Sequence, residues 1–254
     1  MIPRDRRITE PAIPANPYDA PGSLVRAYAK RRNWPIASRN VMLEGRTDSE
    51  YFRIADTKYQ EENSGRKLIC NRLSLFQVGD GDAGGTDNIR EKFVFLREVL
   101  STDSYDAANE RIMAVVLMDN DNAGRSAAQF LDKRGFKLNR DVFLVTRQIP
   151  RQTRDAYQLN RLITETNAGW AGMDCEIEDL LSRDFLEYFA ESEPSALARE
   201  PQLAQGGHHY EWTRDGKARL LQLVKREASC SDVIGIVELL RSLRFLLALN
   251  PDGA

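Results

Sequence analysis

The chain has 254 residues, of which 42% are hydrophobic and 29% are charged, a composition typical of soluble proteins that bury one large core. No apolar stretch approaches the roughly 20 residues of a transmembrane helix, and the N-terminus has no signal-peptide core. The three cysteines, Cys70, Cys175 and Cys230, are widely separated. These features predict a reduced, cytoplasmic protein without a membrane span, disulfides or structural zinc.

The net charge of −2 conceals an uneven distribution. Residues 1–40 contain eight Lys and Arg against three Asp and Glu, whereas residues 41–254 contain 28 against 35. Any contact with nucleic acid must therefore be made by a local basic patch, because the surface as a whole is not basic. The stretch Arg26–Pro35, "RAYAKRRNWP", mixes basic and aromatic residues and could contact bases or phosphates. A solvated helix face that leads into the domain is the favoured alternative.

The predicted elements alternate between strands and helices after an N-terminal arm. Residues 1–37 form this arm, because its first 22 residues contain five prolines and no hydrophobic period. Apolar runs then predict four strands, at 40–45, 73–79, 113–121 and 141–148, and apolar spacing predicts helices at 47–59, 88–100 and 123–135, the last closed by Gly135. A glycine-rich loop, "GDGDAGGTD", follows the second strand. Helices between successive strands indicate an α/β fold with a parallel four-stranded sheet flanked by helices, spanning residues 38–185.

Residues 186–254 are predicted to form a mainly helical C-terminal extension. Its last part, "VIGIVELLRSLRFLLAL" at 233–249, is an amphipathic helix. Core packing is the first interpretation of this helix. The second is a surface that binds a partner or a second copy of the chain in a homodimer, because apolar residues extend around much of its circumference.

Acidic residues follow the first and third predicted strands. Glu44 ends the first strand, and Asp119 and Asp121 end the third. Alternation along a strand directs Asp119 and Asp121 to the same face, where two carboxylates repel unless a cation lies near them. Ligands of parallel sheets gather beyond the carboxyl ends of the strands, so these acids are expected to converge on one edge.

A second acidic group, Glu176, Glu178 and Asp179, lies in "MDCEIEDLL", before a predicted amphipathic helix. Such acids favour a helix N-terminus without any metal. Beside the strand-end acids, they are better explained as oxygen ligands of Mg²⁺ or Mn²⁺. Zinc is not expected, because the cysteines are dispersed and both histidines lie in "GGHHYEW", interpreted as a polar surface loop.

Five segments of the sequence resemble those of a known family. "LEGRTD" at 43–48, followed by "LMDNDNAG" at 117–124, is similar to the TOPRIM domain of topoisomerases, DnaG-type primases and the nucleases of the OLD (overcoming lysogenization defect) family. "CEIEDLL" at 175–181 resembles the third acidic element of OLD-type members, and "GDGDAGGTDNI" resembles their glycine-rich loop. "RDGKARLLQLV" at 214–224 is similar to their lysine-bearing segment. The chain has no GxxxxGK[ST] motif, so the resemblance is to a TOPRIM unit without its ATPase half.

The resemblance implies a metal-dependent nuclease that uses one or two Mg²⁺ or Mn²⁺ ions. Glu44 and Asp119 would be the most sensitive positions, and Lys217 would stabilise charge on the phosphate, although an exposed surface lysine is an equal alternative. The predicted metal ligands are Glu44, Asp48, Asp119, Asp121, Glu176 and Glu178, with Asp179 as a further candidate. Gly81, Gly84 and Gly85 could bind phosphate through backbone N–H groups, and Asp80 and Asp82 could support the ligands; turn chemistry explains all five equally well.

Three functional classes remain open. The favoured one is an endonuclease cutting DNA or RNA, an effector of a prokaryotic anti-phage or toxin-like system that works with a separate ATPase of the ABC type. The second is a non-catalytic TOPRIM module that binds nucleic acid or a protein partner. The third is an RNA-processing maturase. No RNA-specific module distinguishes RNA from DNA as the substrate.

Overall fold

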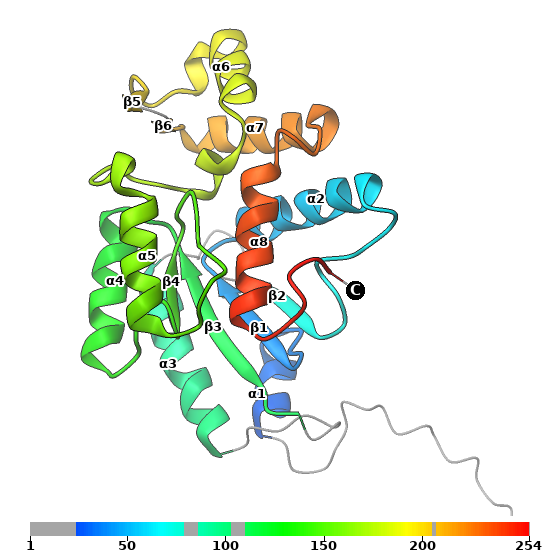
Figure 1. Ribbon diagram of the computed structural model, residues 1–254, viewed down its shortest axis with the longest axis vertical. Coiled ribbons are helices and arrows are strands. Elements are labelled where there is room, and N and C mark those ends of the chain that lie inside the picture. The colour runs from blue at the N-terminus through cyan, green and yellow to red at the C-terminus, as the bar shows by residue number, and fades with distance from the viewer. Residues whose placement is uncertain (1–23, 79–85, 103–109, 205–206, 254) are drawn as a thin grey trace, which may run out of the picture.

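A four-stranded parallel sheet forms the centre of the computed structural model, which describes residues 24–78, 86–102, 110–204 and 207–253 (Figure 1). The strand order is β2-β1-β3-β4, and every pair is parallel. The prediction of an α/β fold with a parallel four-stranded sheet is therefore confirmed. The strands are β1 (Arg39–Leu43), β2 (Leu73–Gln77), β3 (Met113–Met118) and β4 (Val142–Leu144).

The described helices connect these strands and continue beyond them. Each predicted helix is present, with its ends shifted by a few residues, as expected where helix ends fray. The helices are α1 (Leu24–Arg31), α2 (Arg46–Glu62), α3 (Thr86–Thr102), α4 (Asn122–Lys133), α5 (Ala156–Thr166), α6 (Arg183–Ser192), α7 (Arg214–Glu227) and α8 (Ile234–Leu246). An antiparallel pair, β5 (Gln202–Ala204) and β6 (Gly207–His209), lies between α6 and α7 in the chain.

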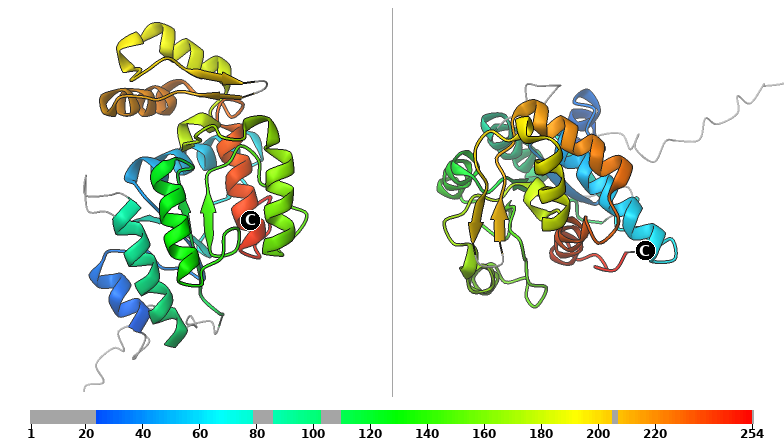
Figure 2. Two further views of the ribbon diagram at one scale, coloured as in Figure 1. Left: turned by 90° about the vertical axis from the view of Figure 1, so that its left-hand side faces the viewer. Right: turned by 90° about the horizontal axis from the view of Figure 1, so that it is seen from above.

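Helices cover both faces of the sheet, because its strands are apolar on both sides. Val41 and Leu43 of β1 pack in one hydrophobic cluster with α2, α5, α7 and α8. Met42, between them, packs in a second cluster with α1, α3 and α4. Figure 2 shows α3 and α4 side by side, and α6 and α7 beyond one end of the sheet. Burial on both faces explains why these strands are continuous apolar runs.

The chain changes direction between β1 and β3. From β1 it crosses through α2 to β2 on one side, and it later returns through α3 to β3 on the other. The register pairs Leu43 of β1 with Leu117 of β3, so Glu44 and Asp119 follow the paired strand ends closely. A change of direction of this kind opens the crevice in which ligands of open α/β sheets bind. The topology therefore places both acids at that crevice.

The C-terminal residues share the core of the sheet. Ile236, Val237, Leu240 and Leu243 of α8 are buried in the cluster that includes β1 and α2. Arg244 is also buried, and its Nε donates to Asn250 O at 2.7 Å. The core is thus continuous across the predicted boundary at residue 186, and the first interpretation of this helix, core packing, is confirmed. The extension also contains the β5–β6 pair, which the sequence did not predict.

The basic and aromatic stretch near the N-terminus packs against the domain. Val25 and Ala29 of α1 are buried, as is Trp34. The Trp34 ring lies 5.2 Å from that of Phe76 and 5.4 Å from that of Tyr28, measured between ring centres. This Trp therefore belongs to the core and is not available for stacking on bases. The arm before residue 24 lies outside the described residues, as do Asp80, Gly81, Asp82, Gly84 and Gly85 of the glycine-rich loop.

No helix in the described part of the chain combines the length and the apolar character needed to cross a lipid bilayer.

Helix α4 begins shortly after the end of β3, next to the crevice. Asp121 is its N-cap, and Asp121 Oδ1 accepts a hydrogen bond from Gly124 N at 2.7 Å. Gly124 itself lies against the preceding turn, so that a Cβ there would lie 1.9 Å from the carbonyl oxygen of Asp119. Since real atoms do not approach so closely, only glycine fits without moving the acidic segment.

Gly124→Ala is expected to destabilise the protein, because the added methyl collides with backbone at the Asp119 turn. The loss should be on the order of 1–3 kcal/mol, which lowers the melting temperature by several degrees. Thermal unfolding followed by circular dichroism measures it. Ser126→Ala, at an exposed position of the same helix, is the matched control and should change little. An unaltered melting temperature in Gly124→Ala would contradict the close packing of this turn.

Candidate functional site

The first two acids of the site lie where β1 passes into α2. Glu44 directly follows β1, and Asp48 lies in the first turn of α2. Asp48 Oδ2 accepts a hydrogen bond from Gly45 N at 3.0 Å, which fixes the carboxylate over the helix N-terminus. Both side chains are half-buried. The helix geometry therefore holds two carboxylates at the carboxyl end of the central strand.

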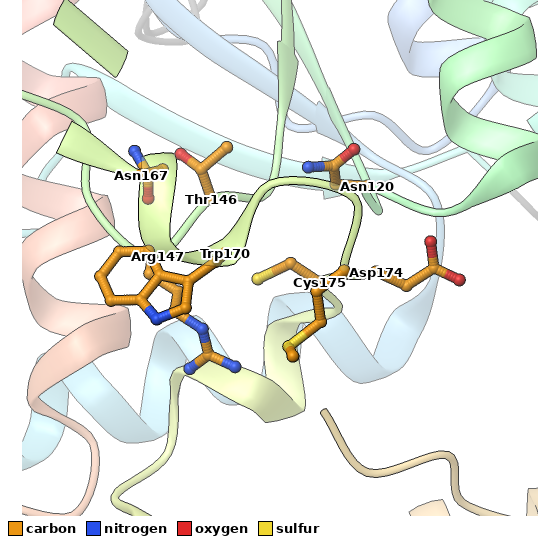
Figure 3. Close-up of a pocket in the computed structure, with 8 residues that line it drawn as sticks. Asn120, Thr146, Arg147, Asn167, Trp170, Asp174 and Cys175 are labelled. Atoms are coloured by element: carbon orange, nitrogen blue, oxygen red, sulfur yellow. The ribbon is translucent and has the colours of Figure 1, made fainter. Parts of the chain in front are cut away.

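The third strand ends earlier than predicted. β3 stops at Met118, and Asn120 makes an isolated antiparallel bridge to Cys175, with Asn120 N donating to Cys175 O at 2.9 Å and Cys175 N donating to Asn120 O at 3.2 Å. Figure 3 shows both residues at the wall of a pocket. The bridge draws the second acidic segment against the end of β3. Strand alternation thus does not govern Asp119 and Asp121.

The second acidic segment forms a short 3-10 helix, Ile177–Leu180, directly after Glu176. Glu178 is buried, with 3% of its surface exposed, whereas Glu176 is partly exposed. A helix N-terminus can hold acids at its surface without burying them, so the burial of Glu178 is not explained by helix capping alone. This segment therefore directs its carboxylates toward the interior of the protein.

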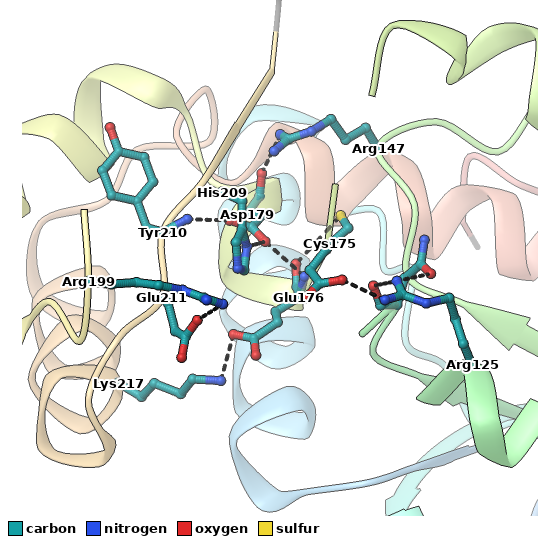
Figure 4. A network of polar contacts seen from close by, with 12 residues as sticks. Arg125, Arg147, Cys175, Glu176, Asp179, Arg199, His209, Tyr210, Glu211 and Lys217 are labelled. Carbon is teal, nitrogen blue, oxygen red and sulfur yellow. Dashed lines mark hydrogen bonds and ion pairs between the residues drawn. The ribbon is translucent and has the colours of Figure 1, made fainter. Parts of the chain in front are cut away.

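Helix α7 supplies the cation of the site. Thr213 caps the helix, accepting from Gly216 N at 3.0 Å, and Lys217 lies in the first turn. Lys217 Nζ donates to Glu176 Oε2 at 2.6 Å (Figure 4). The side chain is 31% exposed, and so the alternative of an ordinary surface lysine is not what the structure shows. The position of Lys217 in the site was predicted only from the family resemblance.

Asp119 lies at the electrostatic centre of the group. Burial, followed by the negative charges of Asp48 and Glu178, raises the pKa of Asp119 well above its usual range. The charges of Glu176 and Glu44 act in the same direction. Because carboxylates influence one another in this way only when they lie close together, five of them, from three distant segments of the chain, share one region. We call Glu44, Asp48, Asp119, Glu176 and Glu178 the acidic cluster.

Two further members of the acidic cluster also retain protons more readily than free carboxylates. Burial is the main cause that raises the pKa of Asp48 to about 6 and that of Glu178 to about 7, and the charge of Glu176 raises both. Lys217 opposes both changes. For Lys217 itself, burial lowers the pKa, but Glu178 and Glu176 outweigh it and raise the pKa above the usual value.

The acidic cluster carries more negative charge than Lys217 can balance. If Asp48, Asp119, Glu176 and Glu178 were all ionised, the ammonium of Lys217 would leave an excess of negative charge in a poorly solvated region. Bound protons can remove this excess, as the raised pKa values of Asp48 and Glu178 indicate, and so can bound cations. The site is therefore one that gains stability from binding positive charge.

The donor atoms suit a hard divalent ion, but their present positions do not form a finished cage. Carboxylate oxygens are the ligands that Mg²⁺ and Mn²⁺ prefer. In the part of the chain that the structure describes, no three His, Cys, Asp or Glu side chains are placed to hold one metal ion together. Binding would require side chains of the acidic cluster to turn toward a common point, and Glu176 to share or leave its contact with Lys217.

Tyr51 of α2 lies beside the acidic cluster, and none of the sequence motifs pointed to it. Its ring is fully buried in α2, and its hydroxyl has no hydrogen-bond partner among the described residues. Burial, with the charges of Glu178 and Asp48, raises the pKa of Tyr51 well above its usual value. A phenol that stays protonated next to carboxylates can donate to one that turns toward it.

Asp121 and Asp179 have structural partners of their own. Asp121 caps α4 through Oδ1, and this bond leaves Oδ2 available for the predicted metal contact. Asp179 is buried, and its Oδ2 accepts from Glu176 N at 2.9 Å and lies 2.8 Å from His209 Nδ1. Its Oδ1 accepts from Tyr210 N at 3.1 Å. Through these contacts, Asp179 connects the acidic segment with β6 (Figure 4).

The interpretation of the two histidines as a polar surface loop is wrong. His208 and His209 are buried on β6, with 6% and 3% of their surfaces exposed. Burial lowers the pKa of His209, but its contact with Asp179 dominates and raises that pKa overall. No local pattern predicts this burial, because a strand of three residues beside glycines is too short to show alternation.

Comparisons with known proteins identify no relative: no family model matches the chain, and no curated protein or solved structure matches it either. The function is therefore inferred from the site itself and from the motifs in the sequence.

Glu178→Gln is expected to stabilise the metal-free protein at alkaline pH. Because the folded-state pKa of Glu178 is raised to about 7 from 4.5, the folded state holds the proton more tightly, and stability falls as pH rises between these values. Gln removes that loss, which should raise the melting temperature by about 2–8 °C at pH 8, for a gain of roughly 1–2 kcal/mol.

Thermal unfolding in EDTA at pH 5 and pH 8 measures this effect. The gain should be small at pH 5 and present at pH 8. Glu165→Gln, at an exposed position of α5, controls for the general effect of removing a carboxylate. Equal differences from the wild type at both pH values would show that Glu178 does not carry the predicted charge penalty.

Proposed function

We propose that the chain is a divalent-metal-dependent nuclease that hydrolyses phosphodiester bonds of DNA or RNA. The observation that supports it most is the acidic cluster, which lies with one lysine at the crevice of the sheet. Structural roles explain a single acid at a helix end, but they do not explain five mutually repelling carboxylates whose charge exceeds that of Lys217. The motifs shared with the TOPRIM domains of OLD-type nucleases point to the same reaction.

The residues have distinct parts in this proposal. Glu44, Asp119 and Glu178 would hold Mg²⁺ or Mn²⁺, with Asp48, Asp121 and Glu176 as further ligands. When bound, one or two such ions polarise the phosphodiester and lower the pKa of an attacking water. Lys217 would leave Glu176 and bind a phosphate oxygen on which charge develops. The Asp179–His209 contact would hold the segment of Glu176 and Glu178 in place.

The physiological setting is proposed from the resemblance alone. OLD-type nucleases are linked to ATPases, and this chain contains no ATP-binding motif of the GxxxxGK[ST] type. An anti-phage or toxin-like effector that works with a separate ABC-type ATPase fits both facts. Purification of the full chain from its native host tests this partnership: co-purification of an ATPase supports it, and a chain isolated alone contradicts it.

One observation favours a second candidate, a non-catalytic module that binds nucleic acid or a protein. Lys217 already forms an ion pair with Glu176, and no three potential ligands of the described residues are placed around one point. A cluster neutralised by lysine and by protons would need no metal. Metal binding distinguishes this candidate from the nuclease.

Glu44→Gln and Asp119→Asn are each expected to reduce cleavage by at least about 100-fold, because each removes a charged ligand from the reacting centre. Plasmid DNA and total tRNA, incubated with the purified chain in Mg²⁺, Mn²⁺ or EDTA, measure activity and identify the substrate class. Asp132→Asn, which removes an exposed carboxylate from α4, should cleave as the wild type does.

Calorimetric titration with Mn²⁺, combined with the cleavage assay, distinguishes three outcomes. Metal-dependent cleavage that is lost in both variants supports the nuclease. Metal binding that depends on Glu44 and Asp119, without cleavage, indicates an enzyme that awaits its partner. The absence of both metal binding and cleavage would refute the proposal and leave the non-catalytic module.

A further inference from the structure

Lys217 interacts with more of the acidic cluster than its one hydrogen bond shows. Its ammonium donates to Glu176 Oε2 at 2.6 Å (Figure 4). Burial lowers the pKa of Lys217, but the charges of Glu178, Glu176 and Asp119 outweigh it and raise that pKa. Burial raises the pKa of Asp48, whereas a backbone hydrogen bond and the charge of Lys217 lower it. One ammonium thus acts on four carboxylates of the acidic cluster.

A simple ion pair on the same helix shows how unusual this contact is. Lys225, about two turns further along α7, contacts Glu50 of α2, and the two side chains are 38% and 14% exposed. The side chains of Lys217 and Glu176 are similarly exposed, at 31% and 15%. The hydrogen bond from Lys225 is the main cause that lowers the pKa of Glu50. Lys225 therefore serves one carboxylate, whereas Lys217 serves a group of them.

The ammonium of Lys217 lies where a metal ion of the acidic cluster would gain most. A divalent ion bound among Asp48, Asp119, Glu176 and Glu178 would be attracted by the same four charges that act on Lys217. It would also lie near the ammonium, and like charges repel strongly in a poorly solvated region. The metal ion and Lys217 therefore compete for the same negative charge.

The start of α7 is fixed, so that only the side chain of Lys217 can move away. Thr213 N donates to Ala196 O at 2.8 Å, and a Cβ on Gly216 would lie 2.3 Å from the same oxygen. The first turn of the helix is thus packed directly against this backbone. The lysine side chain, in contrast, is a flexible four-carbon stem, and it is accessible to solvent. Entry of a metal ion would therefore displace the ammonium and leave the helix in place.

The hydroxyl of Tyr51 indicates that the acidic cluster has a second arrangement. It is buried and has no hydrogen-bond partner among the described residues. After burial, the charges of Glu178 and Asp48 have the largest influence on the pKa of Tyr51, and both raise it. Buried polar groups are almost always satisfied in folded proteins. The arrangement in which Lys217 holds Glu176 leaves this donor unused, whereas a carboxylate that turned toward Tyr51 would satisfy it.

We propose that Lys217 is an internal counter-ion that takes the place of the divalent ion in the metal-free protein, and that a metal ion binds by displacing its ammonium from Glu176. The inference rests on the proposed function, because it takes the acidic cluster as the metal site. It adds that metal binding and the release of Lys217 are one event. In the proposed nuclease, the lysine becomes free to bind a phosphate oxygen only when the metal ion is present.

Metal binding without any nucleic acid tests this role of Lys217 separately from cleavage. The full chain, freed of metal with EDTA and transferred to buffer without it, is titrated calorimetrically with Mn²⁺ at pH 8. Lys217→Met removes the charge, Lys217→Gln removes the charge but keeps a hydrogen-bond donor, and Lys217→Arg keeps the charge. Lys225→Met, which breaks the ion pair of similar exposure with Glu50, is the matched control.

Lys217→Met and Lys217→Gln are each expected to bind Mn²⁺ about 10-fold more tightly than the wild type, because the competing positive charge is gone. The rise in melting temperature on addition of saturating Mn²⁺ should be larger by about 3–5 °C. In EDTA both variants should melt below the wild type, because the carboxylates lose their counter-ion. Lys217→Arg and Lys225→Met should bind Mn²⁺ with nearly the affinity of the wild type.

The sign of the change in affinity decides between the roles of Lys217. Weaker Mn²⁺ binding by both neutral variants would show that the lysine only holds the acidic segment in place, and unchanged binding would show that it does not compete with metal. Either result overturns the inference and leaves the nuclease proposal standing, as does an equal gain in Lys225→Met. Tighter binding confined to the neutral variants of Lys217 supports the inference even if no nucleic acid is cleaved. The absence of Mn²⁺ binding in every protein overturns it together with the proposed function.

Discussion

Carboxylates that share one edge of a sheet repel one another, and the repulsion grows as protein replaces the surrounding water. In this chain Asp119 experiences the charges of four other acids, whereas Lys217 contributes a positive charge to the group at Glu176. The neighbouring structure counteracts the repulsion. The N-terminus of α2 stabilises Asp48, and the buried contacts of Asp179 hold the second acidic segment against it. The acidic cluster is thus maintained by the fold against its own electrostatics.

The small C-terminal elements β6 and α7 also counteract the repulsion between the carboxylates. β6 brings His209 to Asp179, and α7 brings Lys217 to Glu176, so that both elements supply positive or hydrogen-bonding groups to the acidic segment. The other side of that segment faces Arg147, which bonds the carbonyl oxygen of Asp179. Residues 174–181, which include Glu176 and Glu178 of the acidic cluster, are therefore contacted by β6, by α7 and by Arg147 after β4. Their position depends on contacts from three separate parts of the chain.

The sequence predicted those parts of the molecule that follow from periodicity. Apolar runs located the four strands of the sheet, and their alternation with helices predicted the parallel order that brings Glu44 and Asp119 together. The sequence could not predict contacts between residues that are far apart along the chain. The burial of His209 depends on Asp179, thirty positions earlier, and β6 is too short to show a period. Likewise Arg147 belongs to no motif, and its contact with Asp179 becomes visible only when the loop after β4 meets the acidic segment. The ion pair between Lys217 and Glu176 joins positions that are 41 residues apart, so no local pattern predicts it.

The separation of the acidic cluster along the chain has a consequence for folding. Glu44 lies in the N-terminal part of the sequence and Lys217 in the C-terminal part. Helix α8 follows both in the chain and packs into the hydrophobic core that contains β1. Contacts between distant residues form late, because the entropy of closing long loops must be overcome before they are gained. The complete site therefore exists only in molecules whose C-terminal helices have docked. A nascent or partly folded chain would expose some of the acids without the assembled centre, and any activity would appear only when folding is complete.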